Sequence, residues 1–350
     1  MSVQQKIWLF SPKIDVMLFL GSSLISLGIV GMFWAFGLLN QSVGFVPWLI
    51  FVVGIDVSHV YSTIFRTYLL PGELKRKWPL YTILPVTCFL ASLFFYSVVG
   101  ARTFWISMAY VALIHFIRQQ QGFLRLYHRK MSLLKSFERY LDEALIILSC
   151  LFPVAYWHAH GRSFAWFVEG DFNQGFPQWI SDVFGLSYLC LALIYIVVNI
   201  VKYVQTKVVY WGKHLLILAT AISWGVGIVL LDSDLAFTVT NVILHGVPYL
   251  YLNYRVSQKL GAPKWFANLK MLTIPVFLLL LLGLALLEEG LWDRLINHEY
   301  SFFFGSSIAL PHFLVPFFTA LLFTPQLTHY VLDGFIWRKG SHPSLGKVFS

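Results

Sequence analysis

The chain has 350 residues, of which 58% are hydrophobic and 12% are charged, and its mean hydropathy is +0.72. These values lie far outside the range of soluble domains, so they exclude a soluble protein and predict a polytopic membrane protein. The net charge of +9 raises the question of nucleic-acid binding. Its basic residues lie in short segments between apolar runs, which membrane topology explains without a nucleic-acid partner. Cys88, Cys150 and Cys190 form no CxxC pair, and each stands in an apolar run, so we expect small buried residues and no disulfide framework.

Ten apolar stretches reach about 20 residues, the length that crosses the roughly 30 Å hydrocarbon core of a bilayer. The first is too long to be a cleaved signal peptide, and no soluble domain remains between the stretches. We therefore expect an all-α fold, a polytopic membrane helical bundle of about ten transmembrane helices that forms a single integral membrane domain, 1–350. The predicted spans are 16–39, 46–69, 79–99, 104–126, 143–160, 179–204, 215–231, 235–256, 270–288 and 306–336.

The distribution of Lys and Arg predicts the orientation of these spans. With the N-terminus inside, 22 of the 25 Lys and Arg residues fall in segments on the inner side. The outer loops keep the other three and hold many of the acidic residues, among them Glu288 and Glu289. This bias predicts an even number of spans, with both termini cytoplasmic. The location that we expect is the inner (cytoplasmic) membrane of a bacterium.

Some polar residues have ordinary interpretations. The largest inner segment, 127–142, alternates apolar and basic residues and is expected to form a short helix along anionic headgroups. Arg66, at the inner end of span 2, is expected to reach the headgroups as an anchor. His158, near the outer end of span 5, is expected to face water, and His128 and His214 are expected in loops.

Four of the predicted spans carry a histidine in their middle or inner part, and ionisable residues inside a membrane are rare and costly enough to be functional candidates. In spans 2 and 10 an aspartate lies three or four residues away from the histidine, on the same helix face. Spans 4 and 8 each carry a histidine without an aspartate at that spacing. The six candidate metal ligands are Asp56, His59, His115, His245, His329 and Asp333.

The four histidines are expected at one depth. Each lies on an even-numbered span and precedes an arginine at the inner end by 7, 10, 10 and 9 residues in chain order. At about 1.5 Å per residue this places every ring roughly 10–15 Å from the basic end of its helix. A single intramembrane histidine is more often a helix contact than a ligand. Four at one depth, with two aspartates, instead predict a metal site in the inner half of the membrane.

Imidazole and carboxylate donors without a nearby thiolate favour non-haem iron, zinc or manganese. A site with two iron ions would use all six candidates as ligands. A site with one ion would use three or four, with the carboxylates orienting the rings. Haem held by pairs of histidines is an alternative, although it gives Asp56 and Asp333 no role.

These features favour a membrane-embedded, metal-dependent oxidoreductase that hydroxylates, desaturates or cleaves a lipid or isoprenoid substrate, with an electron donor as partner. Arg118 and Gln119, about one turn beyond His115, are candidates for binding an anionic or carbonyl group, and Tyr249 is a third candidate catalytic residue. One alternative is a zinc-dependent hydrolase or lipid transferase, in which an aspartate acts as general base. Others are a haem-binding membrane protein and a proton-coupled transporter that uses the His and Asp residues as a relay.

Overall fold

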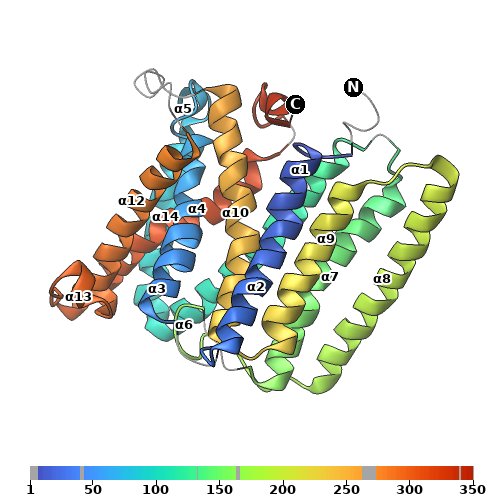
Figure 1. Cartoon of the computed structure of the whole chain (residues 1–350). Helices are drawn as coiled ribbons and strands as arrows, with labels where there is room; N and C mark the ends of the chain where they lie inside the picture. The colour runs from blue at the N-terminus through green and yellow to red at the C-terminus, as the bar shows by residue number, and fades with distance from the viewer. Residues whose placement is uncertain are drawn as a thin grey trace. The chain divides into compact units, whose positions relative to one another are not determined.

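The computed structural model of the chain describes residues 7–39, 43–131, 133–162, 166–261, 273–338 and 340–349 (Figure 1). The described residues form helices and no strand, which confirms the all-helical prediction. They include eight helices that are long and apolar enough to cross a membrane. Residues 270–272, at the start of the ninth predicted span, lie outside the described residues.

The eight helices cover nine of the ten predicted spans, because α6 (Trp78–His128) covers two of them. Gly100, with φ of 81°, interrupts α6 between these two spans. Tyr96 and Phe104 would lie about 12 Å apart along a continuous helix, yet their ring centroids are 5.2 Å apart, so the chain changes direction there. The tenth span corresponds to α14 (Val315–Ile336), which begins later than predicted. The number of crossings and the side of the termini stay predictions.

The chain divides into two compact units. Unit 1 consists of Met1–Val43 and Ala109–His245, and unit 2 consists of Gly44–Met108 and Gly246–Ser350. The boundaries fall inside α6 and α10 (Asp234–Leu260), so each of these helices contributes residues to both units.

In unit 1, α7 packs beside α8 and α9, and α9 packs beside α2 (Figure 1). Its core holds the buried rings of Trp157 and Trp224 among smaller apolar side chains. The elements that lie wholly in unit 1 are α1 (Pro12–Asp15), η2 (Val16–Gly21), α2 (Ser22–Ala35), α7 (Ser136–His160), α8 (Gln178–Thr206), α9 (Trp211–Trp224) and η5 (Gly225–Leu230).

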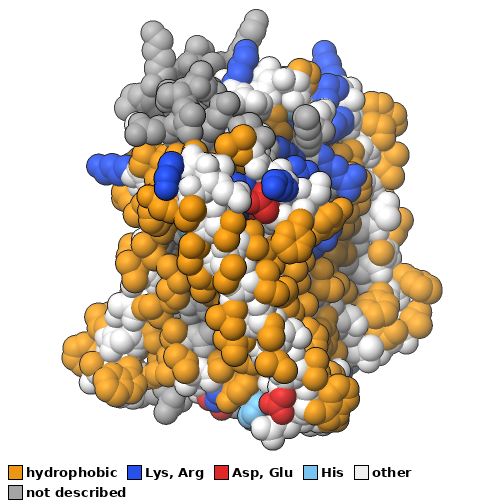
Figure 2. Space-filling view, turned by 90° about the vertical axis from the view of Figure 1, so that its right-hand side faces the viewer, with side chains coloured by type: hydrophobic (Ala, Val, Ile, Leu, Met, Phe, Trp, Pro, Cys, Tyr) orange, Lys and Arg blue, Asp and Glu red, His pale blue; other side chains and the backbone are white. Residues whose placement is uncertain are grey.

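The outer face of α8 is apolar along its length. Its large hydrophobic side chains from Trp179 to Val204 are exposed, and Figure 2 shows this side of unit 1 with hydrophobic side chains over its middle and Lys and Arg at one end. Cys190 lies on the same helix and is exposed, so the prediction that it is buried is wrong. Monomeric soluble proteins rarely expose so large an apolar surface. This exposed apolar surface and the eight long apolar helices indicate that the chain is a membrane protein.

In unit 2, α12 packs against η3, α4 and α14, and α14 also packs against α4. The segment η3 is a π-helix, with i→i+5 hydrogen bonds, that leads directly into α4. The elements that lie wholly in unit 2 are α3 (Phe45–Pro47), η3 (Trp48–Val57), α4 (Ser58–Ser62), η4 (Thr63–Phe65), α5 (Glu73–Arg76), α12 (Ile274–Trp292), η6 (Asp293–Asn297), α13 (Ser301–Phe304), η7 (His312–Leu314), α14 and η8 (Leu345–Phe349).

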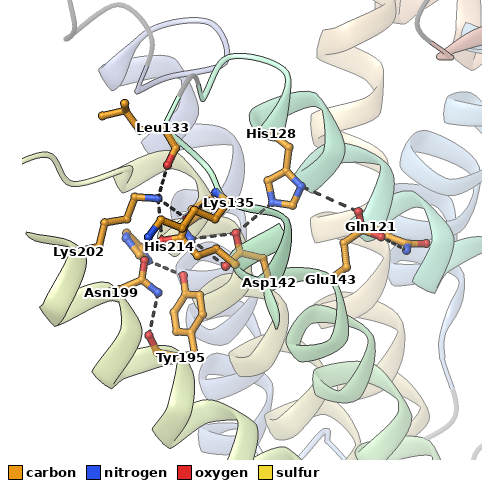
Figure 3. A network of polar contacts seen from close by, with 12 residues as sticks. Gln121, His128, Leu133, Lys135, Asp142, Glu143, Tyr195, Asn199, Lys202 and His214 are labelled. Atoms are coloured by element: carbon orange, nitrogen blue, oxygen red, sulfur yellow. Dashed lines mark hydrogen bonds and ion pairs between the residues drawn. The ribbon is translucent and has the colours of Figure 1, made fainter. Parts of the chain in front are cut away.

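The described residues of 127–142 do not form the separate amphipathic helix that the sequence predicts. Helix α6 continues to His128, and α7 begins at Ser136. Acidic residues in the first turns of α7 turn toward neighbouring helices and form ion pairs with basic residues of α6, α8 and α9 (Figure 3). Several of these charged side chains are buried. We call this set the α7 ion-pair network: Arg125, His128, Glu138, Asp142, Glu143, Lys202 and Lys213.

The pairs in the α7 ion-pair network are close. The Lys202 Nζ atom lies 2.7 Å from Glu138 Oε2, and the Lys213 Nζ atom lies 2.8 Å from Asp142 Oδ1. His128 is buried, with its Nε2 atom 3.0 Å from Asp142 Oδ2, so the prediction that it lies in a loop is wrong. Glu138, in the first turn of α7, is also stabilised by the helix dipole.

Candidate functional site

Two of the predicted ligands, His59 and His329, meet inside unit 2. His59 lies on α4 and His329 on α14, and the two helices pack against each other. The ring centroids are 4.9 Å apart, with the ring planes at 80°. Their exposed fractions are 1% and 2%, so both imidazoles are removed from solvent.

Each of these rings turns its Nδ1 atom toward a polar side chain. The His59 Nδ1 atom lies 3.4 Å from Asp56 Oδ1, as the i,i+3 spacing predicts. The His329 Nδ1 atom lies 2.8 Å from the Thr63 hydroxyl and 3.9 Å from Asp333 Oδ1. Thr63 therefore stands closer to His329 than the aspartate that the sequence pattern selects. Helical spacing cannot find it, because Thr63 and His329 are 266 residues apart in the chain.

Tyr249, a predicted catalytic residue, is buried beside both rings. Its ring centroid is 5.8 Å from that of His59 and 5.3 Å from that of His329. Its hydroxyl group donates a hydrogen bond to Asp333 and lies 3.1 Å from the Thr63 hydroxyl. We call His59, His329, Asp56, Asp333, Thr63 and Tyr249 the unit 2 centre.

The two carboxylates of the unit 2 centre face histidines and, in the part of the chain that the structure describes, no Lys or Arg. Within the described residues, neither Asp56 nor Asp333 forms an ion pair with Lys or Arg. Glu288 is also buried, and it accepts hydrogen bonds from Tyr61 and Trp292. The prediction that Glu288 belongs to an outer loop is therefore wrong, because α12 continues beyond it. The apolar residues on both sides of the Glu288-Glu289 pair are the signal that would have placed it inside the helix.

The other two predicted histidine ligands, His115 and His245, meet inside unit 1. Their ring centroids are 5.1 Å apart. The Phe116 ring stacks on His245 at 3.6 Å, with 5° between the ring planes, which fixes the orientation of that imidazole. Gln119 is buried, and its amide donates to the His245 carbonyl at 2.6 Å. Gln119 thus holds α10 beside α6 at the level of this histidine pair.

Arg118, the remaining predicted catalytic residue, is exposed on α6. Its Nη1 atom donates to Gln121 Oε1 at 3.1 Å, and the Gln121 amide in turn donates to Glu143 at 2.8 Å. Glu143 also accepts from Arg125. These contacts connect Arg118 to the edge of the α7 ion-pair network.

The prediction that Arg66 reaches the headgroups is wrong, because this residue is fully buried in unit 2. Its guanidinium group lies 3.1 Å from Glu73 Oε1 and donates to the Ile336 carbonyl at 2.7 Å. Burial by itself would raise the pKa of Glu73, but hydrogen bonds from Arg76 and Tyr81 and the charge of Arg66 lower it below its ordinary value of 4.5. Arg66 therefore connects α5, through Glu73, to the C-terminal end of α14, through the Ile336 carbonyl.

Two further histidines are also more buried than predicted. His158 is 3% exposed, and its ring nitrogens lie 2.7 Å from the Tyr110 hydroxyl and 2.7 Å from the Val154 carbonyl. His214 lies in the first turn of α9, 2.5 Å from the Tyr195 hydroxyl. Both act as hydrogen-bonded packing residues of unit 1.

The structure thus brings the six predicted ligands together in two groups. Unit 2 holds Asp56, His59, His329 and Asp333, and unit 1 holds the His115–His245 pair. The spacing argument is confirmed for the two His–Asp pairs of unit 2. The expectation that all six bind together at one depth stays a prediction. No protein-family model matches the chain, and neither the search of characterised proteins nor that of solved structures finds a match.

Proposed function

We propose that the protein is a membrane-embedded, metal-dependent enzyme whose metal ion binds at the unit 2 centre. The observation that carries the proposal is a pair of buried imidazoles, 4.9 Å apart, flanked by Asp56 and Asp333 without Lys or Arg as an ion-pair partner in the described residues. Imidazole and carboxylate are the donors that iron, zinc and manganese share.

The charge of the unit 2 centre supports a cation there. An ionised carboxylate away from water is costly unless it is paired, hydrogen-bonded or bound to a metal. The Asp333 carboxylate accepts a hydrogen bond from Tyr249, and Asp56 faces only the imidazole of His59 among the ion pairs of the described residues. A divalent ion between the histidines would offset both charges.

The chemistry we propose is that of a non-haem iron oxidoreductase acting on a lipid or isoprenoid. When bound, the iron would supply the redox chemistry. The protein would hold it through His59 and His329, whose rings are oriented by Asp56 and Thr63 in the way that outer partners orient metal-binding histidines. The apolar face of α8 supports an assignment to substrates dissolved in the membrane, since the chain itself is surrounded by lipid.

The test is elemental analysis with an ultraviolet–visible spectrum, on protein purified in detergent without chelators or a metal-affinity tag. We expect about one equivalent of iron and no Soret band. His59→Ala and His329→Ala should each remove most of the metal. His158→Ala is the matched control, because it deletes a similarly buried histidine that lies in unit 1 and should leave the metal in place.

The possible results separate the alternatives. Zinc in place of iron would support the centre and change the reaction class to hydrolysis, with Asp56 as the candidate base. A Soret band would replace the proposal with haem binding. Folded protein without metal would overturn it and favour proton transfer. His115→Ala and His245→Ala test the larger ligand set, because metal loss in these variants would extend the ligands to the histidine pair of unit 1.

A further inference from the structure

A chain of three hydrogen bonds runs through the unit 2 centre. It leads from the His329 Nδ1 atom to the Thr63 hydroxyl at 2.8 Å, then to the Tyr249 hydroxyl at 3.1 Å, and ends at Asp333 Oδ1. It connects η4, α10 and α14. His329, Thr63 and Tyr249 are each at most 4% exposed.

Counting hydrogens gives this chain a direction. The Asp333 carboxylate only accepts, so the single hydroxyl hydrogen of Tyr249 points to it. The Trp337 indole only donates, and it also approaches the Tyr249 oxygen, at 3.5 Å. Tyr249 has no second hydrogen for Thr63, so the Thr63 hydroxyl donates to Tyr249. Its oxygen then accepts from the ring of His329.

We propose that this chain fixes His329 in the tautomer that carries its hydrogen on Nδ1, which makes Nε2 the metal-binding atom and Thr63 a positioning residue. The metal part rests on the proposed function, whereas the tautomer is a property of the metal-free protein. A carboxylate behind a histidine ring is a known way to orient the ring and raise its basicity. Here Asp333 Oδ1 lies 3.9 Å from the His329 Nδ1 atom. The hydroxyl groups of Tyr249 and Thr63 connect the two, so that the carboxylate orients the ring through them.

His59 has a similar arrangement, which rests on proximity to a carboxylate and not on a hydrogen bond to it. Its Nδ1 atom is the one that faces Asp56, at 3.4 Å. Both rings would then bind through Nε2, and in both the nitrogen that carries hydrogen would be the one turned toward a carboxylate or a hydroxyl group.

The test compares three substitutions in η4 and just after it. Thr63→Val keeps the shape of the side chain and removes the hydroxyl group, and Thr63→Ser keeps the hydroxyl group. Thr67→Val is the matched control, because Thr67 is also fully buried but its hydroxyl group donates to the Thr63 carbonyl at 2.8 Å. The same atoms are therefore deleted one turn away from the centre.

Nitrogen-15 spectra of histidine-labelled, metal-free protein report the tautomer, with the His329 signals assigned by their loss in His329→Gln. We expect the Nδ1–H form in the natural protein, in Thr63→Ser and in Thr67→Val, and its loss in Thr63→Val. Zinc titration against a competing chelator should show dissociation constants about 10–100-fold higher for Thr63→Val, the range found for outer partners of metal-binding histidines. Thr63→Ser should restore the affinity.

The two readouts separate the two proposals. An Nε2–H form of His329 in the natural protein overturns the chain, whatever the metal content. The expected tautomer in a protein that binds no metal upholds the chain and overturns the proposed function. Equal zinc affinity in Thr63→Val and Thr67→Val, with metal bound, overturns the positioning role of Thr63 and leaves the metal centre standing.

Discussion

Two buried polar clusters of this molecule, the α7 ion-pair network and the unit 2 centre, differ in charge balance. In the α7 ion-pair network of unit 1, each of Glu138, Asp142 and Glu143 has a Lys or Arg partner within 2.8 Å. In the unit 2 centre, Asp56 and Asp333 face imidazoles and hydroxyl groups, and among the described residues they have no such partner. The α7 ion-pair network is balanced by its own Lys and Arg side chains, whereas the unit 2 centre is the cluster for which we propose a bound cation. This difference in charge balance is the ground on which we propose a structural role for the first cluster and metal binding for the second.

The largest expected effect comes from breaking the balanced cluster. Asp142→Ala would leave Lys213 buried and unpaired, and we expect a loss of about 3–5 kcal/mol in the free energy of unfolding. The double variant Asp142→Leu with Lys213→Met should recover most of it, since replacing a buried pair by apolar groups is often neutral. Unfolding in detergent measures both. Metal content per folded molecule should not change, and a loss of metal here would remove the functional distinction between the clusters.

Removing a carboxylate from the unit 2 centre should affect metal binding more than the stability of the metal-free protein. Asp56→Asn removes a carboxylate that has no cationic side chain to leave behind, so the metal-free protein should lose little stability. The variant should instead lose the stabilisation that metal adds, which is about 2.7 kcal/mol at a free metal concentration 100 times the dissociation constant. Unfolding curves with and without metal provide the measurement. A large loss in the metal-free state would show that Asp56 is a structural residue.

A smaller effect is expected from the Arg66–Glu73 pair of unit 2. Because the pKa of Glu73 is lowered in the folded state, its stabilisation is present above the ordinary value of 4.5 and is lost as pH falls through the folded value. The natural protein should therefore lose more stability than Glu73→Gln on acidification below pH 4.5. The difference between the two unfolding profiles tests this, and parallel profiles would contradict it.

The smallest effect is expected at the edge of the α7 ion-pair network. Arg118 is exposed, and its guanidinium group donates a hydrogen bond to Gln121. Arg118→Gln should change the free energy of unfolding by less than about 0.5 kcal/mol, as exposed substitutions usually do. If Arg118 binds an anionic substrate group, as its position beyond His115 predicts, turnover should fall while stability and metal content stay the same. A large loss of stability would instead assign it to the network.

Local patterns predicted much of this molecule. Apolar runs located the helices, because burial in lipid selects hydrophobic residues along a continuous stretch of chain. Helical spacing placed Asp56 beside His59 and Asp333 beside His329, because residues three or four apart share a helix face. These predictions depend on neighbours in the chain, so they needed no knowledge of how the helices pack.

Contacts between distant segments were decided by the packing of helices. Thr63 reaches His329 across 266 residues, Tyr61 reaches Glu288 across 227, and Asp142 reaches Lys213 across 71. Hydropathy assigned Arg66, His158 and Glu288 to water or headgroups, yet each is buried with a partner. A polar side chain is stable inside a membrane protein when a complementary group lies within hydrogen-bonding distance. That distance is a property of the folded chain, because it depends on which helix faces meet.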